Sequence, residues 1–176
     1  MVARPSLASK LWTVCISLGL LLCCQYAVLA KEMPLWEGQH KDARLLEVDK
    51  KFVEGIRQAT GNRLDRGAQH AIKRGWEPFN ANDYEQAIRR FNQAWLLDPD
   101  NGALYWGFAL TTHLRGDDLA VVERWFAEAE NRLPNVAELL TDHGRILEEH
   151  DQPERALTYF KRSLVINPTS KLHIAA

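Results

Sequence analysis

A pattern of small and large residues occurs three times in this chain and limits the folds that it can adopt. Its first copy consists of Ala87, Phe91, Ala94 and Pro99, with gaps of four, three and five residues. Gaps of three and four place the first three side chains on one face of an α-helix. Proline disfavours helical geometry in the residue before it, so we expect this helix to end at Asp98. A helix with such an apolar stripe needs a neighbour to cover it.

The same gaps recur twice further along the chain. The second copy is Val122, Phe126, Ala129 and Pro134, and the third is Ala156, Phe160, Ser163 and Pro168. The three prolines therefore recur with a period of about 34 residues, which falls in the range of helical repeat proteins. Such a period indicates one helix-turn-helix unit used three times, in which each unit buries its apolar stripe against the next.

The pattern resembles the tetratricopeptide repeat, a family of helix-turn-helix units of about 34 residues. Asp83 and Tyr84 open the second helix of the first copy, and Gly75 lies upstream at the family's small position. The resemblance implies an all-α fold, a right-handed superhelical stack of antiparallel helix pairs (an α-solenoid) behind a leading N-terminal helix. It divides the chain into repeats at residues 68–101, 102–136 and 137–170.

The sequence departs from the family pattern in places. Ala71 and Arg74 replace the usual large apolar residues of the first repeat, and Pro78 lies inside its first helix. Proline in a helix interior removes a hydrogen bond and clashes one turn back, so we expect a kink or an early end near residues 76–79. One additional residue near Asp118 makes the second repeat one position longer than the third.

A further helix is expected before the repeats. Leu45, Val48, Phe52 and Ile56 have helical spacing, which predicts a helix from Asp42 to about residue 59. We expect it, with a connector to residue 67, to cover the open end of the first repeat, after a linker at 31–41. The tail at 171–176 is too short for a closing helix, so the last apolar face should be partly open.

The segment 1–30 is typical of a secretory signal. Arg4 and Lys10 precede an apolar run over residues 11–24, and small residues precede a cleavage point after Ala30. Two other interpretations stay open, a single membrane-spanning helix and a bacterial lipoprotein anchor at Cys23 or Cys24. All three predict an exported protein, periplasmic or secreted if cleaved and otherwise anchored in a membrane.

Charge and cysteine content exclude several classes of function. The segment 1–30 holds two basic residues, Arg4 and Lys10, and no acidic one, so its removal changes the net charge from −1 to −3. This balance argues against a nucleic-acid partner, because phosphate binding requires a basic face. All three cysteines lie within the same segment, so the rest of the chain holds no disulfide, cysteine metal site or cysteine nucleophile.

If the resemblance holds, the first helices of the repeats line a concave groove that binds a peptide or partner subunit. The groove positions carried onto this sequence are Gln69, Ile72, Trp76, Phe79, Asn80, Trp106, Leu110, His113, Thr141, Arg145, Glu148 and Glu149. They predict an aromatic, apolar half and an acidic half. Trp76 and Trp106 could instead be core residues, and both assignments stay open.

The sequence offers no catalytic or cofactor motif. It contains no G-x-S-x-G, Gly-rich phosphate loop or H-E-x-x-H pattern. We interpret His143 and His150 as solvated surface residues rather than metal ligands, because a metal needs three or four convergent ligands. We therefore expect no enzyme, cofactor or metal, but a protein-binding scaffold of the cell envelope. The alternative is a structural or self-associating subunit of an envelope assembly.

Overall fold

The helices form a single stack of antiparallel pairs. The computed structural model describes residues 31–37 and 40–169, and from Glu32 onward they belong to one unit. The pairs are α3 (Leu64–Asn80) with α4 (Tyr84–Leu97), α5 (Gly102–Arg115) with α6 (Leu119–Arg132), and α7 (Ala137–Glu149) with α8 (Pro153–Ile166).

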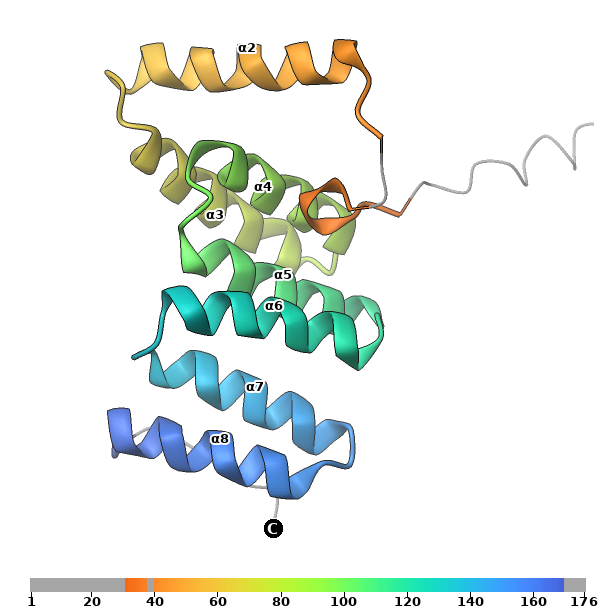
Figure 1. Cartoon of the computed structure of the whole chain (residues 1–176), viewed down its shortest axis with the longest axis vertical. Coiled ribbons are helices and arrows are strands. Elements are labelled where there is room, and N and C mark those ends of the chain that lie inside the picture. The colour runs from red at the N-terminus through yellow and green to blue at the C-terminus, as the bar shows by residue number, and fades with distance from the viewer. Residues whose placement is uncertain (1–30, 38–39, 170–176) are drawn as a thin grey trace, which may run out of the picture. The chain divides into compact units, whose positions relative to one another are not determined.

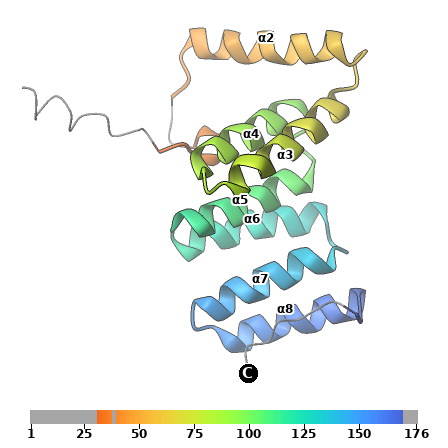
Figure 2. The same ribbon diagram turned by 180° about the vertical axis from the view of Figure 1, so that it is seen from behind.

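A further helix, α2 (Ala43–Ala59), lies at the end of the stack opposite to α8 (Figures 1 and 2). The described residues include no strand. These observations confirm the predicted all-α fold and the stacking of helix pairs, while the handedness of the stack stays a prediction.

Each pair is joined by the same kind of tight turn. Asn82, Gly116 and Asp151 have positive φ angles of 59°, 83° and 56°, and they occupy equivalent places in the three repeats. The residue after each donates its N–H to a carbonyl five positions back, at 2.9, 3.0 and 2.9 Å. This arrangement satisfies carbonyls at the helix end that would otherwise lack partners. The additional residue of the second repeat lies between Gly116 and α6.

Pro78 does not end its helix. Of the two outcomes expected near residues 76–79, the early end is wrong, because α3 continues to Asn80, whereas the kink stays a prediction. Pro78 lies in the last turn, where its carbonyl accepts the N–H groups of Ala81 and Asp83 at 3.0 and 2.9 Å. The proline therefore removes only one backbone hydrogen bond, and its own carbonyl is satisfied by the turn that follows.

Large aromatic rings fill spaces left by small residues on neighbouring helices. Phe91 is fully buried, and a Cβ atom added to Gly75 or Gly107 would lie 2.6 or 2.5 Å from its ring. Gly144 faces Phe160 in the same way, at 2.6 Å. Because these glycines have no side chain, α3, α5 and α7 approach the helices that carry the rings closely.

The leading helix covers the end of the stack only in part. Its bounds match the prediction, and the Asp42 side chain accepts the N–H of Leu45 at 2.9 Å as an N-cap. However, no residue of α2 is buried, and Leu46 and Val48 are 48% and 56% exposed. The expectation that this helix closes the first repeat is therefore wrong for its N-terminal half.

The expected linker is not a free connection. Within it, the short 3-10 helix η1 (Pro34–Trp36) packs against α4, and Pro34 is buried. The buried Asn92 side chain accepts the N–H of Leu35 at 2.7 Å and donates to the carbonyl of Met33 at 3.0 Å. The amide group of Asn92 therefore holds this segment on the second helix of the first repeat.

Candidate functional site

The first helices of the three pairs share a hollow on one surface. Its volume is about 310 Å³, and its lining is Phe79 from α3, Leu110, His113 and Leu114 from α5, and Arg145, Ile146 and Glu149 from α7. We call this feature the groove hollow. It lies at the C-terminal ends of these helices, and α5 and α7 each present residues separated by three and four positions, which is one helix face.

Two polar pairs connect α5 to α7, one within the lining of the hollow and the other one turn earlier on both helices. His113 Nε2 lies 2.9 Å from Glu149 Oε2, and Trp106 Nε1 donates to Asp142 Oδ2 at 3.1 Å. Arg145 also donates to Asp142, at 2.9 Å. Burial raises the pKa of Asp142, although the charge of Arg145 and the hydrogen bond from Trp106 oppose this shift.

The hollow is therefore apolar at its floor and internally paired at its rim. His113 and Arg145 each have an acidic partner in the same chain, so neither requires an anionic ligand. In contrast, Leu114 is 49% exposed and contributes apolar surface to the opening. This arrangement fits an apolar side chain better than a phosphate or carboxylate group.

Five of the predicted groove residues meet in this hollow, namely Phe79, Leu110, His113, Arg145 and Glu149. Trp76 and Trp106 lie between the two assignments that the sequence leaves open, because both are partly buried and pack against the core. Trp76 contacts Phe79 and Phe91 edge to face, with centroid distances of 5.1 and 5.3 Å. Trp106 does not line the hollow, but it lies one turn before Leu110 on α5 and donates a hydrogen bond to Asp142 of α7.

The other predicted residues do not line it. Ile72 is a core residue, only 8% exposed. Thr141 faces α8, where its hydroxyl lies 2.8 Å from that of Ser163. Asn80 is exposed and Glu148 is partly buried, but neither lines the hollow.

Sequence reasoning missed Leu114, Ile146 and Asp142. Leu114 follows Leu110 by four positions and Ile146 precedes Glu149 by three, so a wider helical stripe would have included them. The signal for Asp142 is weaker, because its role depends on Trp106, which is 36 residues away in the sequence.

His143 corrects another expectation, since it is buried rather than solvated. Its ring lies between those of Phe126 and Tyr159, at centroid distances of 4.4 and 4.0 Å, and it is only 2% exposed. Its Nδ1 atom lies 2.9 Å from Glu130 Oε1. By contrast, His150 is exposed, as predicted.

Within the described ranges, no three or more histidine, cysteine, aspartate or glutamate side chains are arranged to hold a metal ion. No helix of the described part is long and apolar enough to cross a bilayer. The predicted signal or anchor lies outside the described residues. Comparisons with models of protein families and with curated proteins found no match.

Proposed function

We propose that this chain is a tetratricopeptide-type scaffold without enzymatic activity that binds a segment of a partner protein in its groove hollow. The observation that carries the proposal is the hollow itself, an apolar depression to which three successive first helices contribute. A segment of a partner protein that lies across the repeats can contact this surface, and the contacts would be mainly apolar.

Membership of the tetratricopeptide family is supported by the period of the structure. The tight turns at Asn82, Gly116 and Asp151 recur with the same period as the proline-marked helix ends, about 34 residues. In two of the pairs, a glycine on the first helix leaves space for an aromatic ring of the second helix: Gly75 for Phe91, and Gly144 for Phe160. These features fit one duplicated unit rather than a collection of unrelated helices.

The partner should offer a large aliphatic or aromatic side chain. Because the rim charges are already paired within the chain, binding energy has to come mainly from apolar burial, to which a single large side chain contributes about 1.5–3 kcal/mol. The signal-like N-terminal segment supports an exported protein, so we expect the partner in the cell envelope.

Leu114 and Leu157 allow a matched test, because each is 49% exposed and they lie on different helices, α5 and α8. The full chain with Leu114→Glu should lose its partner in affinity purification from envelope extracts. The Leu157→Glu chain, which carries the same change away from the hollow, should retain it. Equal retention by both variants would show that the groove hollow is not the binding site.

A further inference from the structure

The leading helix is attached at both ends but stands away from the stack in between. At its C-terminal end, Ile56 fits against Gly67, where an added Cβ atom would lie 2.4 Å from Ile56 Cγ2. Before its N-terminal end, Lys41 forms an ion pair with Asp49, and its Nζ atom lies 3.0 Å from the centre of the Trp36 ring. Between these two attachments, α2 contributes no residue to the core cluster of the described chain.

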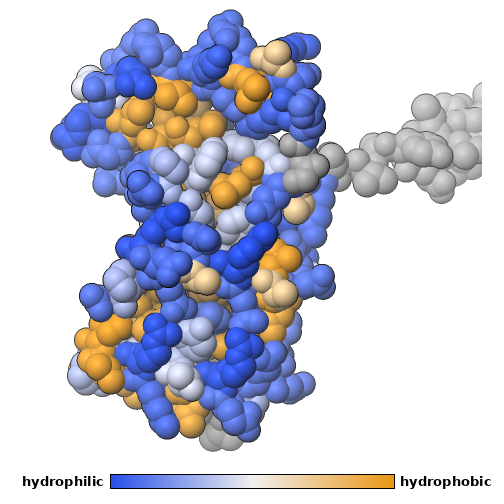
Figure 3. Space-filling model, in the orientation of Figure 1, coloured by the Kyte–Doolittle hydropathy of each residue, from blue (hydrophilic) through white to orange (hydrophobic). Residues whose placement is uncertain are grey.

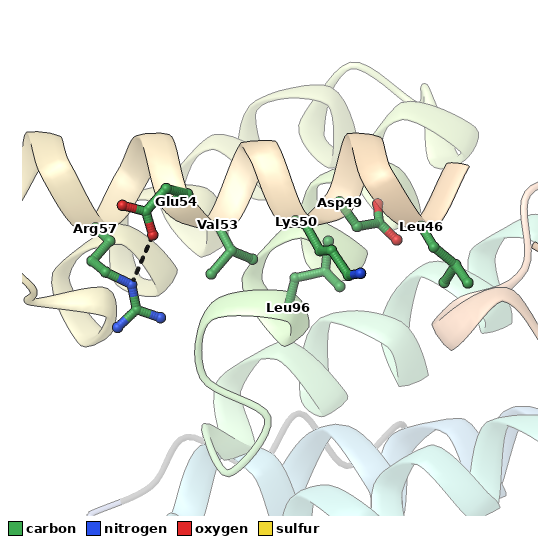
Figure 4. Close-up of a pocket in the computed structure, with 7 residues that line it drawn as sticks. All are labelled: Leu46, Asp49, Lys50, Val53, Glu54, Arg57 and Leu96. Atoms are coloured by element: carbon green, nitrogen blue, oxygen red, sulfur yellow. Dashed lines mark ion pairs between the residues drawn. The ribbon is translucent and has the colours of Figure 1, made fainter. Parts of the chain in front are cut away.

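The space between α2 and α4 is an open cleft with an apolar centre. Its volume is about 550 Å³. Val53 of α2 points toward Leu96 of α4, and Leu46 lines the same cleft nearer to the N-terminal end of α2 (Figure 4). Hydrophobic surface is visible between α2 and the helices below it (Figure 3). Leu46 is 48% exposed, so this cleft is accessible from solvent.

Charged residues flank the apolar centre along the same face of α2. Asp49 and Lys50 lie between the two apolar residues, and Arg57 lies one turn beyond Val53. Asp42, the N-cap, lies one turn before Leu46. Glu54 also lines the cleft and pairs with Arg57 within the chain. Apart from Glu54, the order along the helix is acidic, apolar, acidic with basic, apolar, basic.

This order is complementary to its own reverse. If a second α2 lies antiparallel with residue 46 opposite residue 53 of the partner, Leu46 meets Val53. The same register places Asp49 opposite Lys50 and Asp42 opposite Arg57. Each of these positions then meets a residue of matching polarity or opposite charge, as a two-fold interface requires.

We propose that a second copy of this chain covers the cleft, with the two α2 helices antiparallel and centred between residues 49 and 50. Each Leu46 and Val53 is then buried between the partner helix and Leu96. Lys41 and Glu54 already pair with Asp49 and Arg57 within one chain, so the intermolecular charges mainly select the register.

The charges also argue against the other occupants of such a face. Three acidic residues, Asp42, Asp49 and Glu54, and two basic residues, Lys50 and Arg57, flank the apolar positions, so this face has no net attraction to an anionic membrane surface. A partner surface with a strong charge of one sign would be repelled at the end of α2 that carries the same charge. A second, antiparallel copy instead places basic residues opposite acidic ones.

The contact is small, so the dimer should be weak. By helix rise, the face from residue 42 to 57 is roughly 23 Å long. One helix face of this length covers less than the roughly 800 Å² per partner of a standard stable interface. Association should therefore depend on concentration in the micromolar range or above.

Sedimentation equilibrium of the full chain in non-ionic detergent should show a monomer-dimer equilibrium. Leu46→Glu should weaken it at least tenfold, because it places a carboxylate in the apolar centre, whereas Leu157→Glu should not change it. Leu46 is half exposed, so the variant should keep the helical circular dichroism of the parent protein. A monomer at all concentrations, or a dimer that Leu46→Glu does not weaken, would overturn the proposal.

Cysteine crosslinking tests the register itself, after Cys15, Cys23 and Cys24 are changed to serine. Leu46→Cys and Val53→Cys chains should crosslink when mixed but not separately, because equivalent positions in the dimer lie about 10 Å apart along the axis. If each variant forms a disulfide with itself, and the mixture forms none between residue 46 of one chain and residue 53 of the other, the helices are parallel and the proposal is contradicted. Since Leu114→Glu leaves α2 unchanged, failure of this proposal and failure of the proposed groove are distinguishable.

Discussion

Adding one methyl group at Gly75 should destabilise this protein, although the same change stabilises an ordinary helix. Replacing glycine by alanine in an exposed helix interior favours folding by about 1 kcal/mol. At Gly75, however, the new Cβ atom would lie 2.6 Å from Phe91 Cε1, and two more ring atoms would lie within 2.9 Å. Contacts this short force the ring or the helix to move.

The Phe91 ring has little room to move. Gly107 of α5 approaches it equally closely, and the rings of Trp76 and Phe108 lie at centroid distances of 5.3 and 5.9 Å. Overpacking a buried site of this kind costs about 1–3 kcal/mol. After subtraction of the gain in helix propensity, we expect a net loss of up to about 2 kcal/mol, which corresponds to a decrease in Tm of up to about 8 °C.

Urea unfolding followed by circular dichroism measures this change, and Gly55→Ala is its control. Gly55 lies in the interior of α2, and an added Cβ atom there would have no heavy atom within 4 Å. That variant should be as stable as the parent protein or more stable. In a Phe91→Leu background, which removes the ring, the penalty of Gly75→Ala should shrink or disappear. If Gly75→Ala raises the unfolding midpoint as Gly55→Ala does, the close packing of Phe91 described above is wrong.

Two other substitutions test contacts that join distant parts of the chain. Asn92→Ala leaves the backbone groups of Leu35 and Met33 without their partner, so it should cost about 1–3 kcal/mol and speed hydrogen exchange of the Leu35 amide; unchanged exchange would show that Asn92 does not hold this segment. Burial alone would raise the pKa of Glu130, but hydrogen bonds and charges from His143 and Arg162 outweigh it and lower the pKa. A lowered folded-state pKa contributes stability above the unfolded-state pKa that is lost as pH falls through the folded value. Glu130→Gln should therefore be less stable than the parent near neutral pH, with a difference that narrows in acid; a difference independent of pH would contradict this linkage.

Helix positions could be predicted from the sequence because they depend on local spacing. The gaps of four, three and five residues identify the second helices, and the prolines mark their ends. α6 begins at Leu119 and ends at Arg132, as its apolar spacing and flanking residues indicate. Such signals lie within one turn of the residues that they position, so no knowledge of the other helices is required.

Contacts between helices were harder to predict. His143 has polar residues beside it in the sequence, which suggests a solvated histidine, yet Phe126 and Tyr159 from two other helices enclose it. Asn92 lies on the second helix of the first repeat among residues of mixed polarity, and its partners are 57 and 59 residues away. Nothing in the local pattern shows that either side chain is buried.

The apolar stripe of α2 shows why helical periodicity cannot predict how far a surface is covered. Leu45, Val48, Phe52 and Ile56 are as regularly spaced as the stripes of the repeats, but Leu45 and Val48 are exposed, whereas Phe52 and Ile56 are partly buried. Periodicity shows which residues share a face, whereas burial also requires a neighbouring surface of the same length. Beside Val48 and Phe52, α4 offers Leu96 and the polar side chains of Arg89 and Gln93. An apolar helix that its own chain covers only partly is a surface to which a second molecule can add, and for this reason we place self-association at α2 and partner binding at the groove hollow.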